Sequence, residues 1–200
     1  MKDIKNYIGP LFIILMAVLI RLFPHPANFA PIAAMALFGG TYLNRKYSLI
    51  IVFCTLIVSD YLLLYINPFS PQFINFSKLY SPQSLIHAST LAVYGSFLVV
   101  ALIGIWLRSH KSVKNIIAAS LSSSILFFLI TNFNFFYATS LYPKNIDGML
   151  QAYVMAIPFF KNTLAGDIFY VALFFGSFEA AIKLSKQNIY AYLYKNRRQG

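Results

Sequence analysis

The chain has 200 residues, of which 59% are hydrophobic and only 10% are charged. About a quarter of the residues of a soluble domain are charged, so this composition excludes an ordinary soluble protein and indicates an integral membrane protein. The formal net charge is +11, but the lysines and arginines flank apolar runs, which indicates membrane topology and not a nucleic-acid partner.

Apolar runs of nearly bilayer-spanning length recur along the whole chain, separated by polar residues and prolines. They predict six transmembrane helices near residues 8–23, 29–43, 48–66, 85–107, 115–136 and 163–184. The expected fold is all-α: a six-transmembrane-helix bundle that forms a single integral membrane domain over residues 1–200.

The first predicted span leads into RLFPHPANFAP, residues 21–31, with an arginine, a histidine and three prolines. The prolines cannot continue either neighbouring helix, so this stretch predicts a stiff turn. No small-x-small cleavage pattern closes the first apolar run, which indicates an uncleaved span and not a secretory signal. The next run, FAPIAAMALFGGTYL, is short and rich in small residues, which predicts a helix that is tilted, broken or shielded by its neighbours.

The basic residues set the expected orientation, because cytoplasmic loops carry an excess of lysine and arginine. With the N-terminus inside, twelve basic residues fall on the inner side of the six spans and four on the outer side. Both termini are therefore expected in the cytoplasm. Of the outer links, Asn67 to Ser84 is rich in proline and aromatic residues. Residues 137–162 carry an apolar stripe at helical spacing, which predicts a helix that lies along the outer surface, folds back as a lid or only packs over the bundle.

Hydrophilic side chains within and beside the spans gather mainly in the predicted outer half, although ionisable groups are costly in a membrane. Such clustering suits a pocket open to the exterior, with carboxylates and amides to orient a ligand and aromatic rings to stack on it. The candidate substrate-binding residues are Arg21, His25, Asp60, Asn132, Asn134, Lys161, Asp167 and Tyr170.

Several of these residues have a second interpretation. Asp60 and Asp167 could instead form ion pairs with Arg21 or Lys161, or serve a cation or a proton. The two asparagines at 132 and 134 are separated by one residue, so they diverge by about 200° on a regular helix and both face the interior only if the helix unwinds.

Two residues outside this group also carry expectations. Glu179 precedes Lys183 by four residues, which predicts a local ion pair or, alternatively, a contact with a cytoplasmic partner. Cys54, the single cysteine, lies within an apolar run and is expected to be a buried structural thiol.

The sequence lacks the motifs of common catalytic sites. It has neither G-x-x-x-x-G-K nor H-E-x-x-H, and its three histidines are dispersed. We therefore expect no ATP hydrolysis, no catalytic triad and no enzyme activity. A transition-metal site from His25 and His87 with Asp60 and Asp167 is a minor alternative, and no metal or cofactor is expected.

Three stretches resemble a known family: PHPANFAPIAAMALFGGTYL, VSDYLL and AIPFFKNTLAGDIFYVALFFG. They are similar to an uncharacterised family of small bacterial membrane proteins, which itself resembles the substrate-capture (S) components of energy-coupling-factor (ECF) vitamin transporters. The resemblance implies a bundle in the bacterial inner membrane that holds a vitamin-like molecule in its outer half. It also implies a membrane coupling protein and cytoplasmic ATPases as partners.

This chain departs from the S-component pattern at two places. Small residues spaced by four form the docking face on the first helix of S components, whereas this chain has only Ala17 among bulky residues there. Nickel- and cobalt-specific members have histidine as second residue, and here Lys2 stands in its place. The expected function is a substrate-binding membrane subunit for uptake of a small organic solute; the alternative is a structural or scaffold subunit without a ligand.

Overall fold

The computed structural model describes residues 2–63, 65–66 and 89–197. These residues form six helices: α1 (Lys2–Arg21), α2 (Ile32–Tyr42), α3 (Arg45–Leu63), α4 (Thr90–Leu107), α5 (Val113–Ala138) and α6 (Ile146–Arg197). The predicted all-α class is confirmed, and each predicted span overlaps one helix. The outer link from Asn67 to Ser84, the start of the fourth predicted span and His87 lie outside the described residues.

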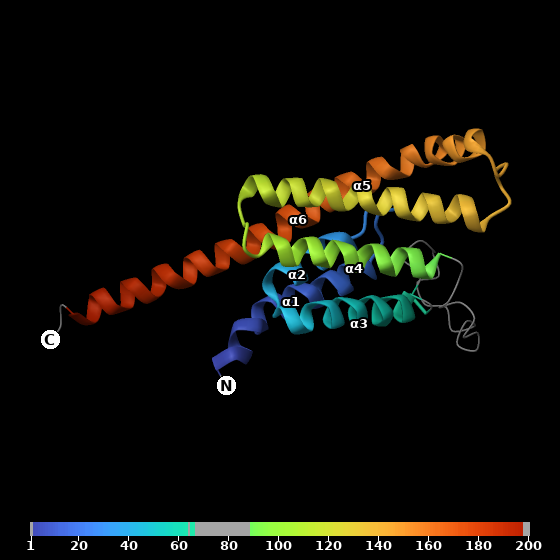
Figure 1. Ribbon diagram of the computed structural model, residues 1–200. Coiled ribbons are helices and arrows are strands. Elements are labelled where there is room, and N and C mark those ends of the chain that lie inside the picture. Colours follow the sequence, from blue (N-terminus) through green and yellow to red (C-terminus); the bar gives the residue numbers. More distant parts are fainter. Residues whose placement is uncertain (1, 64, 67–88, 198–200) are drawn as a thin grey trace.

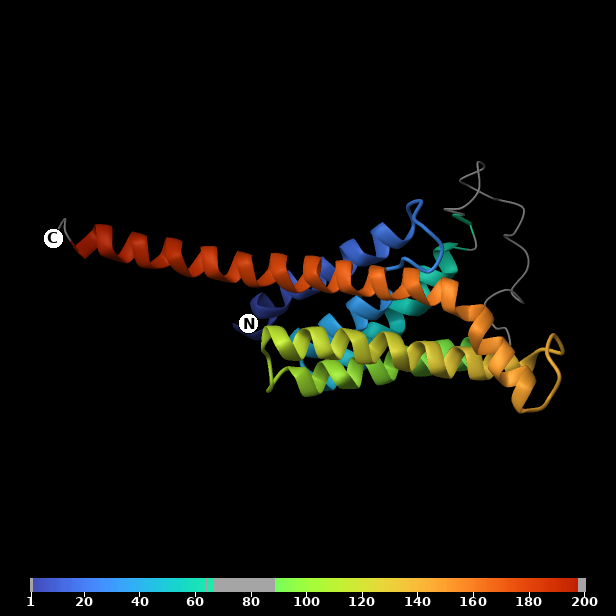
Figure 2. The same ribbon diagram turned by 90° about the horizontal axis from the view of Figure 1, so that it is seen from above.

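Both termini lie at the same end of the bundle, together with the short links from α2 to α3 and from α4 to α5 (Figures 1 and 2). We call this the inner end. The link from α1 to α2 and the link from α5 to α6 lie at the opposite end, which we call the outer end. This arrangement follows from short connections between helices that alternate in direction.

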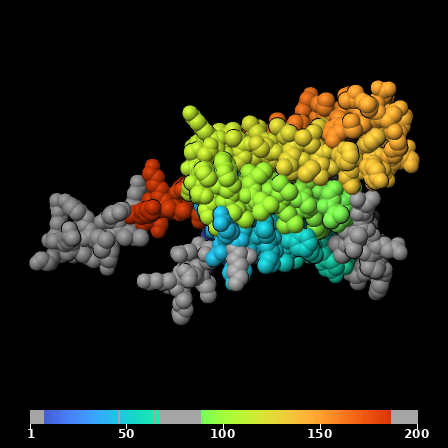
Figure 3. Space-filling view, in the orientation of Figure 1, coloured from blue at the N-terminus to red at the C-terminus, as the bar shows by residue number. Residues whose placement is uncertain are grey.

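The short helix α2 forms the centre of the bundle. Its residues from Ala33 to Thr41 are all buried, and it packs against each of the other five helices. Figure 3 shows the face of the molecule that α4 and α5 cover. Eleven residues span only about 17 Å, too little for a bilayer, so α2 is the helix shielded by its neighbours that the small residues predict.

α2 approaches α4 closely because glycines stand at the crossing. A Cβ at Gly40 would lie 2.2 Å from the carbonyl oxygen of Ala101, and one at Gly104 would lie 2.3 Å from that of Leu37. Thr41 adds a hydrogen bond from its Oγ1 to the Gly104 carbonyl oxygen at 3.1 Å. Backbone-to-backbone contact of this kind is typical of small residues in membrane helix pairs.

α6 is much longer than the predicted sixth span. It runs for 52 residues and includes Pro158, so it is about 78 Å long, well beyond the 40–45 Å of a bilayer with its headgroups. Figure 2 shows a bend in its orange outer part and a straight red part that extends past the bundle at the inner end. The segment predicted as a separate surface helix or lid over residues 137–162 is therefore the end of α5, a short link and the first turns of α6.

In the part of the chain that the structure describes, three helices are long and apolar enough to cross a membrane: Thr90–Leu107, Val113–Ala138 and Ile146–Lys186. Among the described residues, Ile8–Arg21, Ile32–Tyr42 and Tyr47–Leu63 are shorter apolar helices. Large apolar side chains such as Phe12, Leu15 and Ile50 are exposed on the outside of the bundle. Cys54 is also exposed, so the expectation of a buried thiol was wrong. Its side chain lies on the face of α3 that points away from the bundle core.

Candidate functional site

Two adjoining cavities lie near the outer end, between the α1–α2 link, α4, α5 and α6. Their volumes are about 210 Å³ and about 110 Å³, and Asn28, Phe127 and Thr163 line both. Aromatic rings supply much of the wall: Phe97, Phe127, Phe128, Phe159 and Phe160. Polar groups are few, namely Asn28, Thr131, Asn132, Thr163 and Asp167. An apolar wall with a few convergent polar groups is the usual composition of a small-molecule site.

The α1–α2 link forms part of the wall of both cavities through Asn28 and is fixed to α6. Asn28 adopts φ 63°, a left-handed conformation that asparagine tolerates better than most residues. Asn162 donates a hydrogen bond from Nδ2 to the carbonyl oxygen of Ala27 at 3.0 Å. A Cβ at Gly166 would lie only 3.0 Å from the Cα of Phe29, so the glycine allows the link to approach the helix. The stretch predicted as a stiff turn from its prolines thus contributes to the wall of the outer cavities.

Asp167 lies at the wall of the smaller cavity. Its exposed fraction is 3%, and the Oγ of the fully buried Ser124 donates a hydrogen bond to its Oδ2 at 2.6 Å. Ser124 belongs to the sequence SLSSS in α5, in which Ser120, Ser123 and Ser124 are all buried. The described residues form ion pairs elsewhere, but none of these pairs includes Asp167.

Arg21 and Asp60 form a separate cluster between α1, α3 and α4. Arg21 Nη1 lies 2.6 Å from Asp60 Oδ1 and also donates to the Ser59 hydroxyl. The Tyr94 hydroxyl donates to the other oxygen of Asp60. None of these four residues lines the outer cavities. Of the alternatives that the sequence left open for Asp60, the structure thus has the ion pair with Arg21.

The other predicted site residues divide between the cavities and the surface. Asn132 lines the larger cavity and donates from Nδ2 to the Phe128 carbonyl oxygen at 2.8 Å. Asn134 does not line it, because α5 is continuous and the two amides diverge as expected for a regular helix. Lys161 is exposed and lines neither cavity. Tyr170 is buried and lines neither cavity; its ring centroid lies 5.5 Å from that of Phe29 in the α1–α2 link.

His25 lies in the α1–α2 link, outside the helices. Partial burial lowers its pKa below the ordinary value of 6.5, and the neighbouring Arg21 guanidinium lowers it further. The neutral imidazole is thus the favoured form. His25 does not line the outer cavities.

Some contributors to the site were not predicted. The serine run SLSSS within an otherwise apolar helix was a usable signal for Ser124, because hydroxyls in the middle of a span tend to find polar partners. Phe97 and Phe127 had no distinguishing signal, since phenylalanine is frequent throughout this sequence. Their ring centroids are 4.8 Å apart and the rings are stacked.

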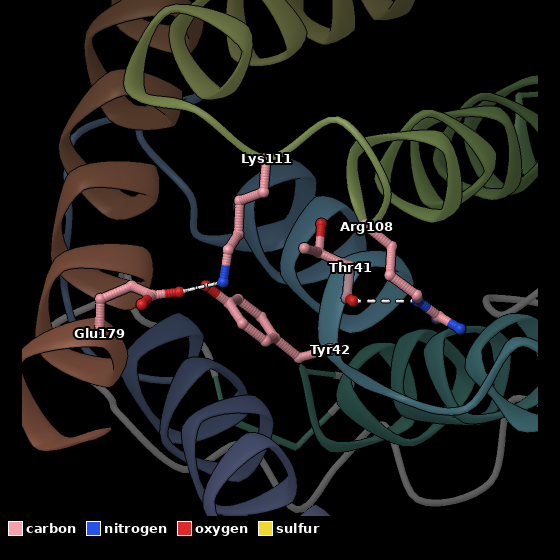
Figure 4. A network of polar contacts seen from close by, with 5 residues as sticks. All are labelled: Thr41, Tyr42, Arg108, Lys111 and Glu179. Carbon is pink, nitrogen blue, oxygen red and sulfur yellow. Dashed lines mark hydrogen bonds and ion pairs between the residues drawn. The ribbon is translucent and has the colours of Figure 1, made fainter. Parts of the chain in front are cut away.

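A second polar cluster lies at the inner end, shown in Figure 4. Glu179 of α6 accepts a hydrogen bond from the Tyr42 hydroxyl at 2.5 Å and pairs with the Lys111 ammonium. The predicted local ion pair of Glu179 with Lys183 was therefore wrong: the cation comes from the α4–α5 link, which lies nearer in space. The cluster ties α6 to the end of α2 and to that link.

Arg108 belongs to the same inner region and binds the end of α2. Its Nη2 donates to the Gly40 carbonyl oxygen at 2.7 Å and to that of Leu43, and its Nε donates to that of Thr41 at 3.1 Å. A cavity of about 320 Å³ lies beside these groups, lined by Thr41, Tyr42, Leu43, Asn44, Arg108 and Lys111. Arg108 already donates to backbone carbonyl oxygens. We therefore interpret the five residues of Figure 4, which we call the inner clamp, as a structural contact that holds the end of α2 in place.

The family model described as "Family of unknown function (DUF6580)" matches residues 2–190. No curated protein and no solved structure matches the chain. The matched range includes every residue that lines the outer cavities and all five residues of the inner cluster in Figure 4.

Proposed function

The chain belongs to the DUF6580 family of unknown function, and from that premise we propose that it is a substrate-binding membrane subunit for uptake of a small organic solute. The observation that carries this proposal is the pair of adjoining cavities at the outer end, whose walls combine aromatic rings with a buried carboxylate. A site of this size suits a small molecule and not a macromolecule.

We also propose that the six helices lie in the bacterial inner membrane as a six-span bundle with both termini in the cytoplasm, in which the short helix α2 crosses while shielded by its neighbours. Three long apolar helices and the exposed apolar side chains of α1 and α3 support the membrane location. The excess of basic residues at the inner end supports the orientation. On this orientation, the cavities lie toward the exterior and the tail of α6 lies in the cytoplasm.

Energy for uptake would come from partners, as in the ECF transporters whose S components the family is expected to resemble. The small residue expected to mark a docking face on the first helix, Ala17, is only 1% exposed. α1 instead exposes bulky side chains such as Phe12, Leu15 and Leu19. A coupling protein and its ATPases would therefore need another face of the bundle, and their co-purification with this chain is the test of an energised complex.

Thermal unfolding of the purified protein with a panel of small solutes tests the binding function. We expect some solutes to raise the melting temperature of the wild type, because a ligand that binds only the folded state stabilises it. Ala156→Phe fills the larger cavity and should abolish this rise. Ala165→Phe adds the same ring at an exposed position of the same helix and should retain it. A panel without any effect, or an unchanged rise in Ala156→Phe, would contradict the proposal.

A scaffold subunit is the second candidate function. It is favoured by the two carboxylates that are satisfied within the protein, Asp60 by Arg21 and Glu179 by Lys111. In that case no solute would raise the melting temperature, and the protein would co-purify with stable membrane partners instead.

A further inference from the structure

The three acidic side chains within the bundle differ in how their charge is balanced. Asp60 has Arg21 and Glu179 has Lys111, although the side chains of these two acids are 25% and 43% exposed. Among the described residues, Asp167, at 3% exposed, has only the Ser124 hydroxyl as partner. In the part of the chain that the structure describes, its other oxygen, Oδ1, has no hydrogen-bond donor. The most buried acid is thus the one without a cation.

A buried carboxylate without a cation is energetically costly. A single hydroxyl donor offsets part of the desolvation and leaves the charge in place. The cost is removed if the group binds a proton or if a cation from outside occupies the adjoining space. Asp167 does adjoin such a space, because it lines the smaller outer cavity.

The walls of the cavities favour an organic cation. Phe97 and Phe127 stack beside Asp167 in the smaller cavity, and the rings of Phe128 and Phe160 meet in the larger one with centroids 4.6 Å apart. The faces of aromatic rings attract ammonium groups. A bound metal ion is not favoured, because the described residues contain no group of three or more histidine, cysteine or acidic side chains that could hold one.

Resting on the proposed function, we infer that the solute is a small organic cation whose charged nitrogen binds Asp167 among these phenylalanine rings. The carboxylate accepts a charge-assisted hydrogen bond or lies in direct contact with a quaternary nitrogen. The amide of Asn132 and the hydroxyl of Thr163 are available in the cavities for the polar groups of the rest of the solute. Bound solute thereby supplies the positive charge that the protein supplies to Asp60 and Glu179.

Matched pairs of charged and neutral probes test this inference on the purified full-length protein at neutral pH. One pair is phenethylamine, which is protonated, and phenethyl alcohol; the other is choline and its neutral carbon isostere dimethylbutanol. We expect the charged member of at least one pair to bind the wild type about tenfold or more tightly than its neutral partner, measured by calorimetry.

Two substitutions in α6 test whether the preference for the charged probe depends on Asp167. Asp167→Asn keeps the size of the side chain and an acceptor for Ser124, and it should bring the two affinities to within about threefold of each other. Asp147→Asn removes the same charge at an exposed position at the start of α6 and should leave the preference of the wild type intact. If Asp167→Asn does not fold, the preference of the wild type for charged over neutral probes alone decides whether the solute is a cation.

The outcomes separate this inference from the function on which it rests. Equal affinity for charged and neutral probes, a preference for the neutral probes, or an unchanged preference in Asp167→Asn would overturn the cationic solute and leave the binding site standing. If the wild type binds none of these probes but a different solute in the broader panel, the inference is overturned unless that solute is a cation whose binding Asp167→Asn weakens. A protein that binds no member of either panel would overturn both.

Discussion

Gly104 allows α4 to approach α2 closely because its side chain is a single hydrogen atom. A Cβ there would lie 2.3 Å from the Leu37 carbonyl oxygen, so Gly104→Ala must push α4 away from α2. We expect a loss of about 1–3 kcal/mol of stability, visible as a lower melting temperature. Gly95 lies on the same helix with nothing within 4 Å of an added Cβ, and Gly95→Ala should be neutral or slightly stabilising. Equal melting temperatures for the two variants would contradict the close crossing.

His25 gives the α1–α2 link a pH dependence with a defined sign. Burial and Arg21 hold the pKa of His25 below 6.5 in the folded protein, so the unfolded chain binds the proton more readily. The contribution to stability is therefore present above pH 6.5 and is lost as the pH falls through the lower pKa of the folded state. NMR titration should show a midpoint below 6.5, and Arg21→Gln should raise it. A midpoint at or above 6.5 in the wild type would show that the imidazole is not held in its neutral form.

Sequence reasoning found many of the polar residues at this scale but did not decide between their possible partners. Arg21, Asp60 and Asp167 were all singled out because charges in apolar runs are conspicuous. Which acid pairs with the arginine depends on how each helix is rotated about its axis, and no single sequence reports that rotation. Asp60 faces α1 and therefore pairs, whereas Asp167 faces α5 and meets Ser124.

At the scale of elements, the end of α2 is stabilised by a side chain from the α4–α5 link. Its last carbonyl groups lie in the bundle interior, and Arg108 of the α4–α5 link donates to three of them. Arg108→Gln cannot reach all three, and we expect a loss of about 2–3 kcal/mol because buried carbonyls are left without donors. Arg45→Gln removes the same charge from an exposed arginine at the inner end and should have little effect. Thermal unfolding of the two variants provides the comparison.

The helices themselves were largely predictable, with one clear exception. Apolar run length placed the described ends of α3, α4 and α5 to within three residues and the end of α1 to within two, but α1 begins at Lys2, six residues before the predicted span. The start of α6 was missed because Pro158 and the polar stretch KNT at residues 161–163 indicate a break. A proline tilts a helix without ending it when neighbours satisfy the freed carbonyl groups, and α6 continues through this position.

At the scale of the whole molecule, the topology can be tested by labelling. In a Cys54→Ser background, a cysteine replaces either Ser140 in the α5–α6 link or Ser109 in the α4–α5 link, both exposed positions. A membrane-impermeant maleimide added to intact cells should label the first and should label the second only after the membrane is opened. Labelling of both positions from the same side would contradict the proposed orientation.

The whole arrangement was less predictable than its parts. The count of spans and the basic residues predict which helix ends lie together, and the structure places both termini at one end. The order of packing, with α2 at the centre, depends on side-chain volumes at the Gly40 and Gly104 crossing. The cavities depend in turn on where that crossing sets α4 relative to α5 and α6, and this distance is a property of the assembled bundle.

The length of α6 has a mechanical consequence. Asp167 at the outer cavity and Glu179 at the inner clamp lie twelve residues apart on one unbroken helix, about 18 Å along its axis. α6 packs against the bundle along part of its length and then continues beyond the inner end. If a bound solute tilted α6 as a rigid body at Asp167, the displacement would reach the Lys111 ion pair at Glu179 and would be larger at the far end of the helix. On the proposed orientation, such a displacement would report occupancy of the outer cavities at the cytoplasmic end of α6.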